Sequence, residues 1–151
     1  MHQTYTTNNS ITISPTGEAY EQFEALANAA ITPGQLVELL STGKVQKQAT
    51  AKVDAERAVA IEDYLQGNDI ADDYSAGAVV MYRIFKRGGL VSLILADGEN
   101  VAIGDELEAA LAGEVQKYTN GVKLFVAMNA VDASDSATTP VASRRIVGRV
   151  K

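Results

Sequence analysis

Acidic side chains form the densest group of residues that could do chemistry in this sequence. The group consists of Glu62, Asp63, Asp69, Asp72 and Asp73. Carboxylate oxygens are the ligands that a hard cation such as Ca²⁺ prefers, but their spacing here does not follow a calcium-binding EF-hand loop. Clustered charges on a loop are more often simply solvated. The sequence therefore favours a solvated acidic loop, with a cation site as the alternative.

Other catalytic chemistry lacks its usual residues. The 151-residue chain contains no Cys and a single His, His2. Without Cys there are no thiolate nucleophiles, disulfides or Cys-ligated metals. A histidine at the end of the chain is poorly placed to hold a serine nucleophile in a triad, and the glycine-rich phosphate-binding motifs are absent. We therefore expect a protein that is not an enzyme and uses no cofactor or metal, a carboxylate pair being the remaining catalytic alternative.

The charge balance limits the classes of partner. Lys and Arg total 13 against 19 Asp and Glu, a net charge of −6. An acidic surface repels nucleic-acid phosphates and anionic lipids, so we expect neither nucleic acid nor membrane as a partner. The longest apolar stretches, such as 78–81 and 93–96, are too short to span a bilayer, and the N-terminus has no signal-peptide pattern. We expect synthesis in a cytoplasm.

Basic residues gather at the C-terminus, where no acid follows Asp135. They are Arg144, Arg145, Arg149 and Lys151. Three interpretations stay open: binding of phosphate groups, protection of an edge strand against aggregation, and complementarity to an acidic patch on a partner protein.

Short β-strands are the elements that must position these residues. The hydrophobic content of 46% is enough for a core, and Pro33–Gly34 suits a type II turn. Asp97–Gly98 and Asn120–Gly121 are hairpin signals, and 86–89 is another tight connection. Helix is the alternative to strand at 19–30, and helix is possible at 50–57 and 105–111. Strands are expected at 19–30, 36–40, 45–48, 58–61, 79–85, 90–95, 122–128 (Val122, Leu124, Val126 and Met128 on one face) and 144–150.

An internal repeat supports this β pattern. Aligning Gly34 with Gly104 gives an offset of 70 residues. The repeat predicts two related β-hairpins in one barrel and argues against a helix at 105–111. Identical residues at this offset are Glu38, Gly43, Val45, Gln46 and Lys47, matching Glu108, Gly113, Val115, Gln116 and Lys117.

The first eighteen residues differ in composition from the rest. Residues 1–18 are rich in Thr, Asn, Ser and Gln, with one alternating patch at 10–13. Two isoleucines bury too little area to order such a segment, so we expect an arm at 1–18 and a β domain at 19–151. The arm is suited to strand addition at a neighbour's sheet edge, with a frayed terminus of no function as the alternative.

Three segments resemble the capsid decoration, or cement, proteins of tailed bacteriophages: ITPGQLVE at 31–38, AIEDYLQGNDIADDYSAG at 60–77 and LADGENVAIGDELE at 95–108. Their order and spacing fit from about residue 25 onward. The resemblance implies a mainly β fold, a small β-barrel or β-tulip-like domain with an extended N-terminal arm. It also implies a homotrimer on the capsid exterior that binds the major capsid protein at three-fold and quasi-three-fold positions and stabilises the head against DNA pressure.

The arm carries the candidate capsid-binding residues, which are Thr6, Ile11, Thr12 and Ile13. Ordering of the arm on a capsid sheet edge would be offset by main-chain hydrogen bonds and burial of the two isoleucines. The alternative function is a carbohydrate- or ligand-binding β module displayed on a virion. The absence of Trp gives little support to a sugar-binding aromatic platform.

Overall fold

The computed structural model describes residues 10–14, 19–135 and 137–151, and its regular structure is mainly β, as predicted. The strands are β1 (Tyr20–Leu26), β2 (Val37–Leu39), β3 (Val45–Lys47), β4 (Ala58–Ala60), β5 (Val79–Phe85), β6 (Leu90–Ile94), β7 (Asn100–Val101), β8 (Glu106–Ala109), β9 (Val115–Lys117), β10 (Phe125–Ala127), β11 (Val131–Asp132) and β12 (Arg145–Val150). Single 3₁₀ turns are η2 (Tyr64–Gln66), η3 (Leu111–Gly113) and η4 (Val141–Ser143).

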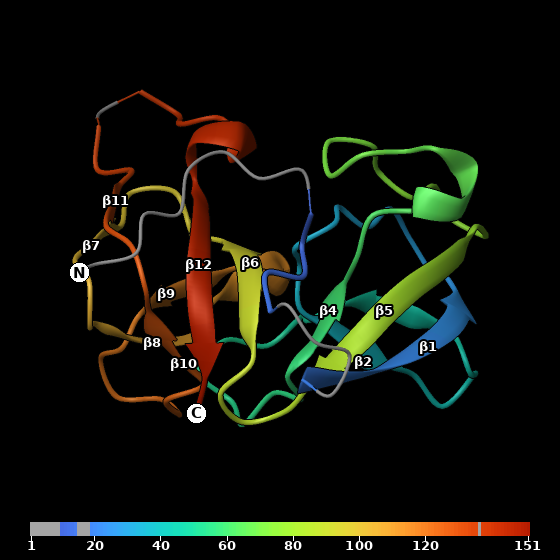
Figure 1. Ribbon diagram of the computed structural model, residues 1–151, viewed down its shortest axis with the longest axis horizontal. Helices are drawn as coiled ribbons and strands as arrows, with labels where there is room; N and C mark the ends of the chain where they lie inside the picture. Colours follow the sequence, from blue (N-terminus) through green and yellow to red (C-terminus); the bar gives the residue numbers. More distant parts are fainter. Residues whose placement is uncertain (1–9, 15–18, 136) are drawn as a thin grey trace.

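Two main sheets lie side by side (Figure 1). One has the strand order β1-β5-β4, and the other has the order β6-β12-β10-β8-β9. Two-stranded ladders, β2–β3 and β11–β7, complete the pairing, and all named ladders are antiparallel. The expected barrel does not close into a continuous ring in the described residues, because the strands are divided among separate sheets.

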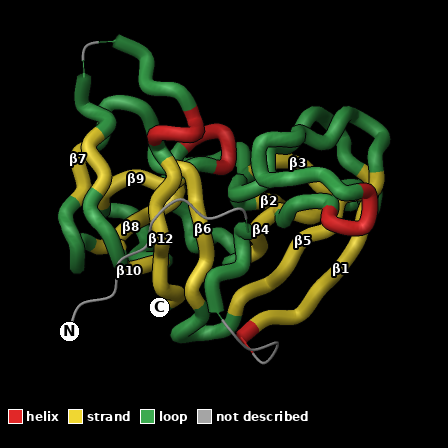
Figure 2. Tube along the Cα trace, turned by 45° about the horizontal axis from the view of Figure 1, so that its top comes forward, coloured by secondary structure: helices red, strands yellow, loops and turns green. Residues whose placement is uncertain are grey.

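The second half of the chain repeats the strand order of the first. The order β1-β5-β4 recurs as β6-β12-β10. The hairpin β2–β3 adjoins β4 through a bridge between Leu36 and Val59, and the hairpin β8–β9 adjoins β10 through the pair Glu106 and Val126. We call β1–β5 the first repeat and β6–β12 the second repeat. Figure 2 shows the two groups of strands from another side.

The two hairpins share their register as well as their strand order. Glu38 lies opposite Gln46 in the first repeat, and Glu108 lies opposite Gln116 in the second. In both pairs the Gln side chain donates a hydrogen bond of 2.6 Å to the Glu carboxylate. The repeat seen in the sequence therefore marks equivalent hairpins, and 106–109 is a strand rather than a helix.

The turns before these hairpins are also equivalent. Gly34 and Gly104 have φ values of 99° and 90°, in the left-handed region that glycine adopts without strain. The Gln35 and Asp105 amides each donate a 3.1 Å hydrogen bond to the carbonyl three residues earlier. The turn predicted at Pro33–Gly34 is thus present in both repeats.

Several local predictions were wrong because distant pairing overrides local signals. The connection 86–89 is tight, as predicted, with a 2.9 Å hydrogen bond from the Gly89 amide to the Lys86 carbonyl, but the strands it joins belong to different sheets. Asp97–Gly98 makes no hairpin, because β7, which follows it, pairs with β11. Asn120–Gly121 makes no hairpin, since β9 and β10 both pair with β8. In the predicted strand 122–128 the core-facing residues of β10 are Phe125 and Ala127, while Val126 is half-buried.

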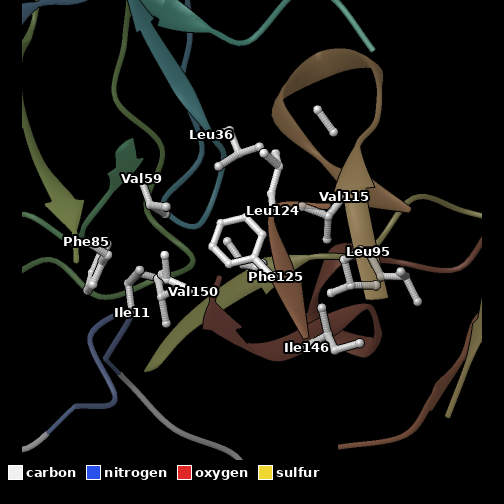
Figure 3. Close-up of a cluster of buried hydrophobic side chains, with 14 of the residues drawn as sticks. Ile11, Leu36, Val59, Phe85, Leu95, Val115, Leu124, Phe125, Ile146 and Val150 are labelled. Atoms are coloured by element: carbon white, nitrogen blue, oxygen red, sulfur yellow. The ribbon is translucent and has the colours of Figure 1, made fainter. Parts of the chain in front are cut away.

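A main hydrophobic core joins the two repeats (Figure 3). A second, smaller core lies on the opposite face of the β1-β5-β4 sheet and includes Tyr74, Val80 and Tyr82. β4 and much of β5 therefore have buried side chains on both faces of the sheet, whereas most of β1 is exposed. The labelled members of the main core are Ile11, Leu36, Val59, Phe85, Leu95, Val115, Leu124, Phe125, Ile146 and Val150.

Residues 10–14 take part in this packing. Ile11 is fully buried in the main core, and its amide donates a 3.0 Å hydrogen bond to the Glu62 carboxylate. The expectation that two isoleucines cannot order this segment was therefore wrong for residues 10–14, because the domain already supplies a core for Ile11. The domain boundary at residue 18 stays a prediction for the rest of the arm.

Candidate interaction surface

The residues proposed for capsid contact are used largely by the chain itself. Ile11 is buried, and Thr12 bridges Val91 while its hydroxyl accepts a 2.7 Å hydrogen bond from Arg83. Ile13 is half-buried, and Thr6 lies outside the described residues. In this arrangement Ile11 has no surface to offer another chain, and the capsid role of all four residues stays a prediction.

The acidic loop does not assemble into a cation site. Glu62 accepts hydrogen bonds from Ser10 and Ile11, whereas Asp69 and Asp72 organise their own loop through backbone amides. Within 10–14, 19–135 and 137–151, no three or more His, Cys, Asp or Glu side chains are placed to share a metal ion. The solvated-loop interpretation accounts for Asp69 and Asp72, and Glu62 anchors the N-terminal segment.

Two of the C-terminal arginines, Arg144 and Arg145, bind backbone carbonyls inside the molecule. Arg144 is buried and donates to the carbonyl of Leu95 (2.7 Å) and the carboxylate of Glu114 (2.9 Å). Arg145 donates to carbonyls of Pro33 and Ile70, which links the second repeat to loops of the first. Burial lowers the pKa of Arg145, although nearby acids oppose this shift.

Protection of an edge strand was the wrong interpretation of these basic residues. The strand that carries Arg145 and Arg149, β12, lies between β6 and β10. It is therefore an interior strand of its sheet. Arg144 and Arg145 already donate to groups of the chain, which disfavours phosphate binding at these two residues.

An exposed edge strand is the main unpaired feature of the described residues. β1 is the outer strand of its sheet. The carbonyl of Ala19 and the amide of Ala27 form 2.8 Å hydrogen bonds on the β5 side, so the odd-numbered residues of β1 bond inward. Antiparallel pairing alternates along a strand, so the backbone groups of Gln22 and Glu24 point away from the sheet. In the part of the chain that the structure describes, no strand pairs with these groups.

Apolar side chains accompany this edge. Phe23 is 41% exposed and stacks on Tyr82, with ring centroids 5.8 Å apart. Leu26 and Val79 lie opposite one another at the end of the same ladder and are about half exposed. η2 lies at this end of the sheet in both views and carries the exposed Leu65 (Figures 1 and 2).

The buried carboxylate of Glu108 has a strongly lowered pKa, and the cause is its hydrogen bonding within the fold. Glu108 is fully buried and accepts hydrogen bonds from the amides of Thr119 (3.1 Å) and Gly121 (2.8 Å) and from the side chain of Gln116. Burial alone would raise its pKa, but these donors favour the charged form and lower the pKa of Glu108 to about 2. Its function is to fix the loop between β9 and β10.

Sequence reasoning missed both the Glu108 site and the β1 edge. Glu38 and Glu108 are the same residue type at equivalent positions, which indicated a shared hairpin. This match did not indicate that Glu108 is fully buried while Glu38 is half-buried. The Asn120–Gly121 signal marks the loop that Glu108 holds. No helix in the part of the chain that the structure describes is long and apolar enough to cross a membrane.

Comparison with known proteins identifies a shared fold. No protein-family model and no curated protein matches the sequence. The structure is similar to the crystal structure of the head fiber gp8.5 N base in bacteriophage phi29, with a TM-score of 0.58 and 10% sequence identity. The match covers 87% of this chain and 94% of that chain. At this identity the similarity establishes the fold and leaves the activity to be argued separately.

Proposed function

We propose that this protein is a structural component of a tailed-bacteriophage virion, a decoration protein on the capsid exterior. The observation that carries the proposal is the fold shared with a phage head fiber base over nearly the whole of both chains. The three segments that resemble decoration proteins, 31–38, 60–77 and 95–108, add a second line of support. The proposed activity is adhesion, which needs no catalytic group.

The mechanism we propose is bridging of neighbouring capsid subunits. A homotrimer at three-fold and quasi-three-fold positions would contact several copies of the major capsid protein at once. Each contact can be weak, because the second and third contacts of one trimer form at high effective concentration. The shared core and the Arg145 links hold the two repeats together, which suits a domain that transmits load.

Within the arm we propose two different tasks. Ile11, Thr12 and Ile13 anchor the arm to the domain through the core and β6. Thr6 lies beyond this anchor and is the proposed capsid contact in the arm. An anchored arm loses less conformational entropy on binding than one joined by a loose linker, because its origin is already fixed.

The test uses phage heads that lack the protein. Purified protein is added to saturation, and we expect it to sediment with mature heads at a fixed ratio and to raise their rupture temperature. Light scattering of the free protein should give three times the 16.0 kDa chain mass. The matched control is the chain lacking residues 1–9, which should keep its fold and bind heads more weakly. Unchanged rupture temperature at saturation would reject head stabilisation, and glycan binding without head binding would favour the alternative module.

A further inference from the structure

The outer edge of the second repeat is already paired with an extended segment of the same chain, residues 10–14. Thr12 forms an antiparallel bridge with Val91 of β6. The Ser92 amide donates to the Ile11 carbonyl at 2.7 Å, and the Ile13 amide donates to the Leu90 carbonyl at 3.1 Å. β6 is therefore covered where it would otherwise end its sheet.

The internal repeat identifies the equivalent positions on β1. Parallel bridges from Ala27 to Val45 and from Leu95 to Val115 align Ala27 with Leu95, because the two valines are equivalent in the hairpin repeat. This alignment has an offset of 68 residues. With this offset β1 is the equivalent of β6. Both are outer strands, in the orders β1-β5-β4 and β6-β12-β10.

At this offset Leu90, Val91 and Ser92 correspond to Gln22, Phe23 and Glu24. The hydrogen bonds of β1 to β5 independently leave Gln22 and Glu24 directed outward. The two observations agree. The Gln22 carbonyl and the Glu24 amide occupy the positions at which the Leu90 carbonyl and the Ser92 amide bind residues 11–13 in the second repeat. Within the described part of the chain, this site on β1 has no strand beside it.

We propose that the outer edge of β1 binds an extended segment of a partner protein as an added antiparallel strand. The Gln22 carbonyl and the Glu24 amide make the central main-chain hydrogen bonds, as Leu90 and Ser92 do in the second repeat. Main-chain bonds supply affinity in strand addition, and side-chain pairs across the edge supply specificity. The inference goes beyond the virion proposal, because it applies to any partner that carries such a segment.

The charges on the edge select the chemistry of the occupant. Glu21 and Glu24 are exposed on β1, and Glu21 forms a long 3.9 Å ion pair with Lys86. A second copy of β1 would bring four carboxylates together on a protein of net charge −6, which is unfavourable. A basic segment is favoured instead. The partner strand should carry a basic residue opposite Glu24, an apolar residue opposite Phe23 and a second basic residue opposite Glu21. The position opposite Gln22 can hold any residue.

The experiment uses a synthetic peptide as the partner strand. The sequence Val-Thr-Lys-Ile-Thr-Lys-Thr places its isoleucine opposite Phe23 and its lysines opposite Glu24 and Glu21. We expect saturable binding to the full chain and slowed hydrogen exchange at the outward amides of Gln22 and Glu24. A peptide with Glu in place of both Lys is the control and should bind at least about tenfold more weakly. Equal binding of both peptides, or no protection on β1, would overturn the proposal.

Two variants separate the charge from the backbone contribution. Glu24→Lys should weaken binding of the basic peptide several-fold, whereas Glu99→Lys makes the same charge change outside β1 and should leave binding unchanged. Glu24→Pro removes an amide that bonds nothing inside the sheet and should abolish binding. If the proline variant does not fold, Glu24→Lys decides the question. Equal affinity of Glu24→Lys and Glu99→Lys, or dimerisation of the free chain through β1, would contradict the proposed occupant.

Discussion

The two repeats share a strand order but differ from each other at two places, the hairpin glutamate and the outer edge strand. Glu38 is half-buried and accepts a hydrogen bond from Gln46. Its equivalent Glu108 is fully buried and organises the loop at Thr119 and Gly121. The repeated backbone places the two glutamates at equivalent positions. The loop that packs over each side chain determines how much that side chain contributes to the free energy of unfolding.

The outer edges differ in the same way. β6 is extended by residues 10–14, whereas β1 ends its sheet with its outward groups free in the described residues. One repeat thus completes itself with the N-terminal segment, and the other presents the same geometry to a partner. If these differences determine stability, equivalent substitutions in the two repeats should change the free energy of unfolding by different amounts.

Replacing the buried glutamate should have the largest effect. Glu108→Ala leaves the Thr119 and Gly121 amides without an acceptor in a buried site, so we expect a loss of about 4 kcal/mol in the free energy of unfolding. The equivalent change Glu38→Ala should cost less than about 1 kcal/mol. Urea unfolding measures both variants. Equal losses would show that the repeats are energetically equivalent at this position.

Removing the buried side chain of the N-terminal segment should come next. Ile11→Ala opens a cavity in the main core, and we expect a loss of about 3 kcal/mol. Deleting residues 1–9 is the control and should change the melting temperature little, whereas deletion through residue 14 should destabilise the domain. A protein that melts normally without residues 1–14 would show that this segment is not needed for the second repeat.

A glycine specific to the second repeat gives a smaller effect. Gly148 on β12 pairs with Val91, and the equivalent pair in the first repeat is Tyr82 with Phe23. A Cβ at Gly148 would lie 2.7 Å from Leu93 and 3.2 Å from Phe125. Gly148→Ala should therefore cost about 2 kcal/mol, measured by thermal unfolding. A neutral substitution would mean that the second repeat is packed more loosely than the structure shows.

The pH dependence should show the smallest change under mild conditions. The folded-state pKa of Glu108, about 2, is below its ordinary value of 4.5, so its contribution is complete above about pH 5 and is lost as the pH falls toward 2. Between pH 7 and pH 4 we expect this group to account for a loss of about 1 kcal/mol. Glu108→Gln should lack that part of the slope and Glu38→Gln should retain it, in urea titrations at each pH.

The sequence predicted the parts of the repeat that local chemistry specifies. Gly34 and Gly104 require left-handed backbone, and the identical Val-Gln-Lys strands mark one register. The equivalence of β5 and β12 was not predictable, because residues at equivalent positions have very different side chains, such as Tyr82 and Gly148. The two repeats keep the same strand order, but the side chains packed on each face differ.

The candidate site was harder to predict than the fold. Burial of Ile11 depends on Glu62, Phe85 and Val150, which come from distant parts of the chain. No local pattern at 10–14 contains that information. The outer edge of β1 could not be predicted either, because the composition of one strand does not show which other strands pair with it.

Imaging of phage heads with and without the protein shows directly whether the protein decorates the capsid. Heads lacking the protein are reconstructed before and after addition of the purified full chain at saturation. For a decoration protein we expect new density on the outer surface at three-fold and quasi-three-fold positions, and three copies of this two-repeat domain should fit into it. Heads that stay bare at saturating protein would contradict this function.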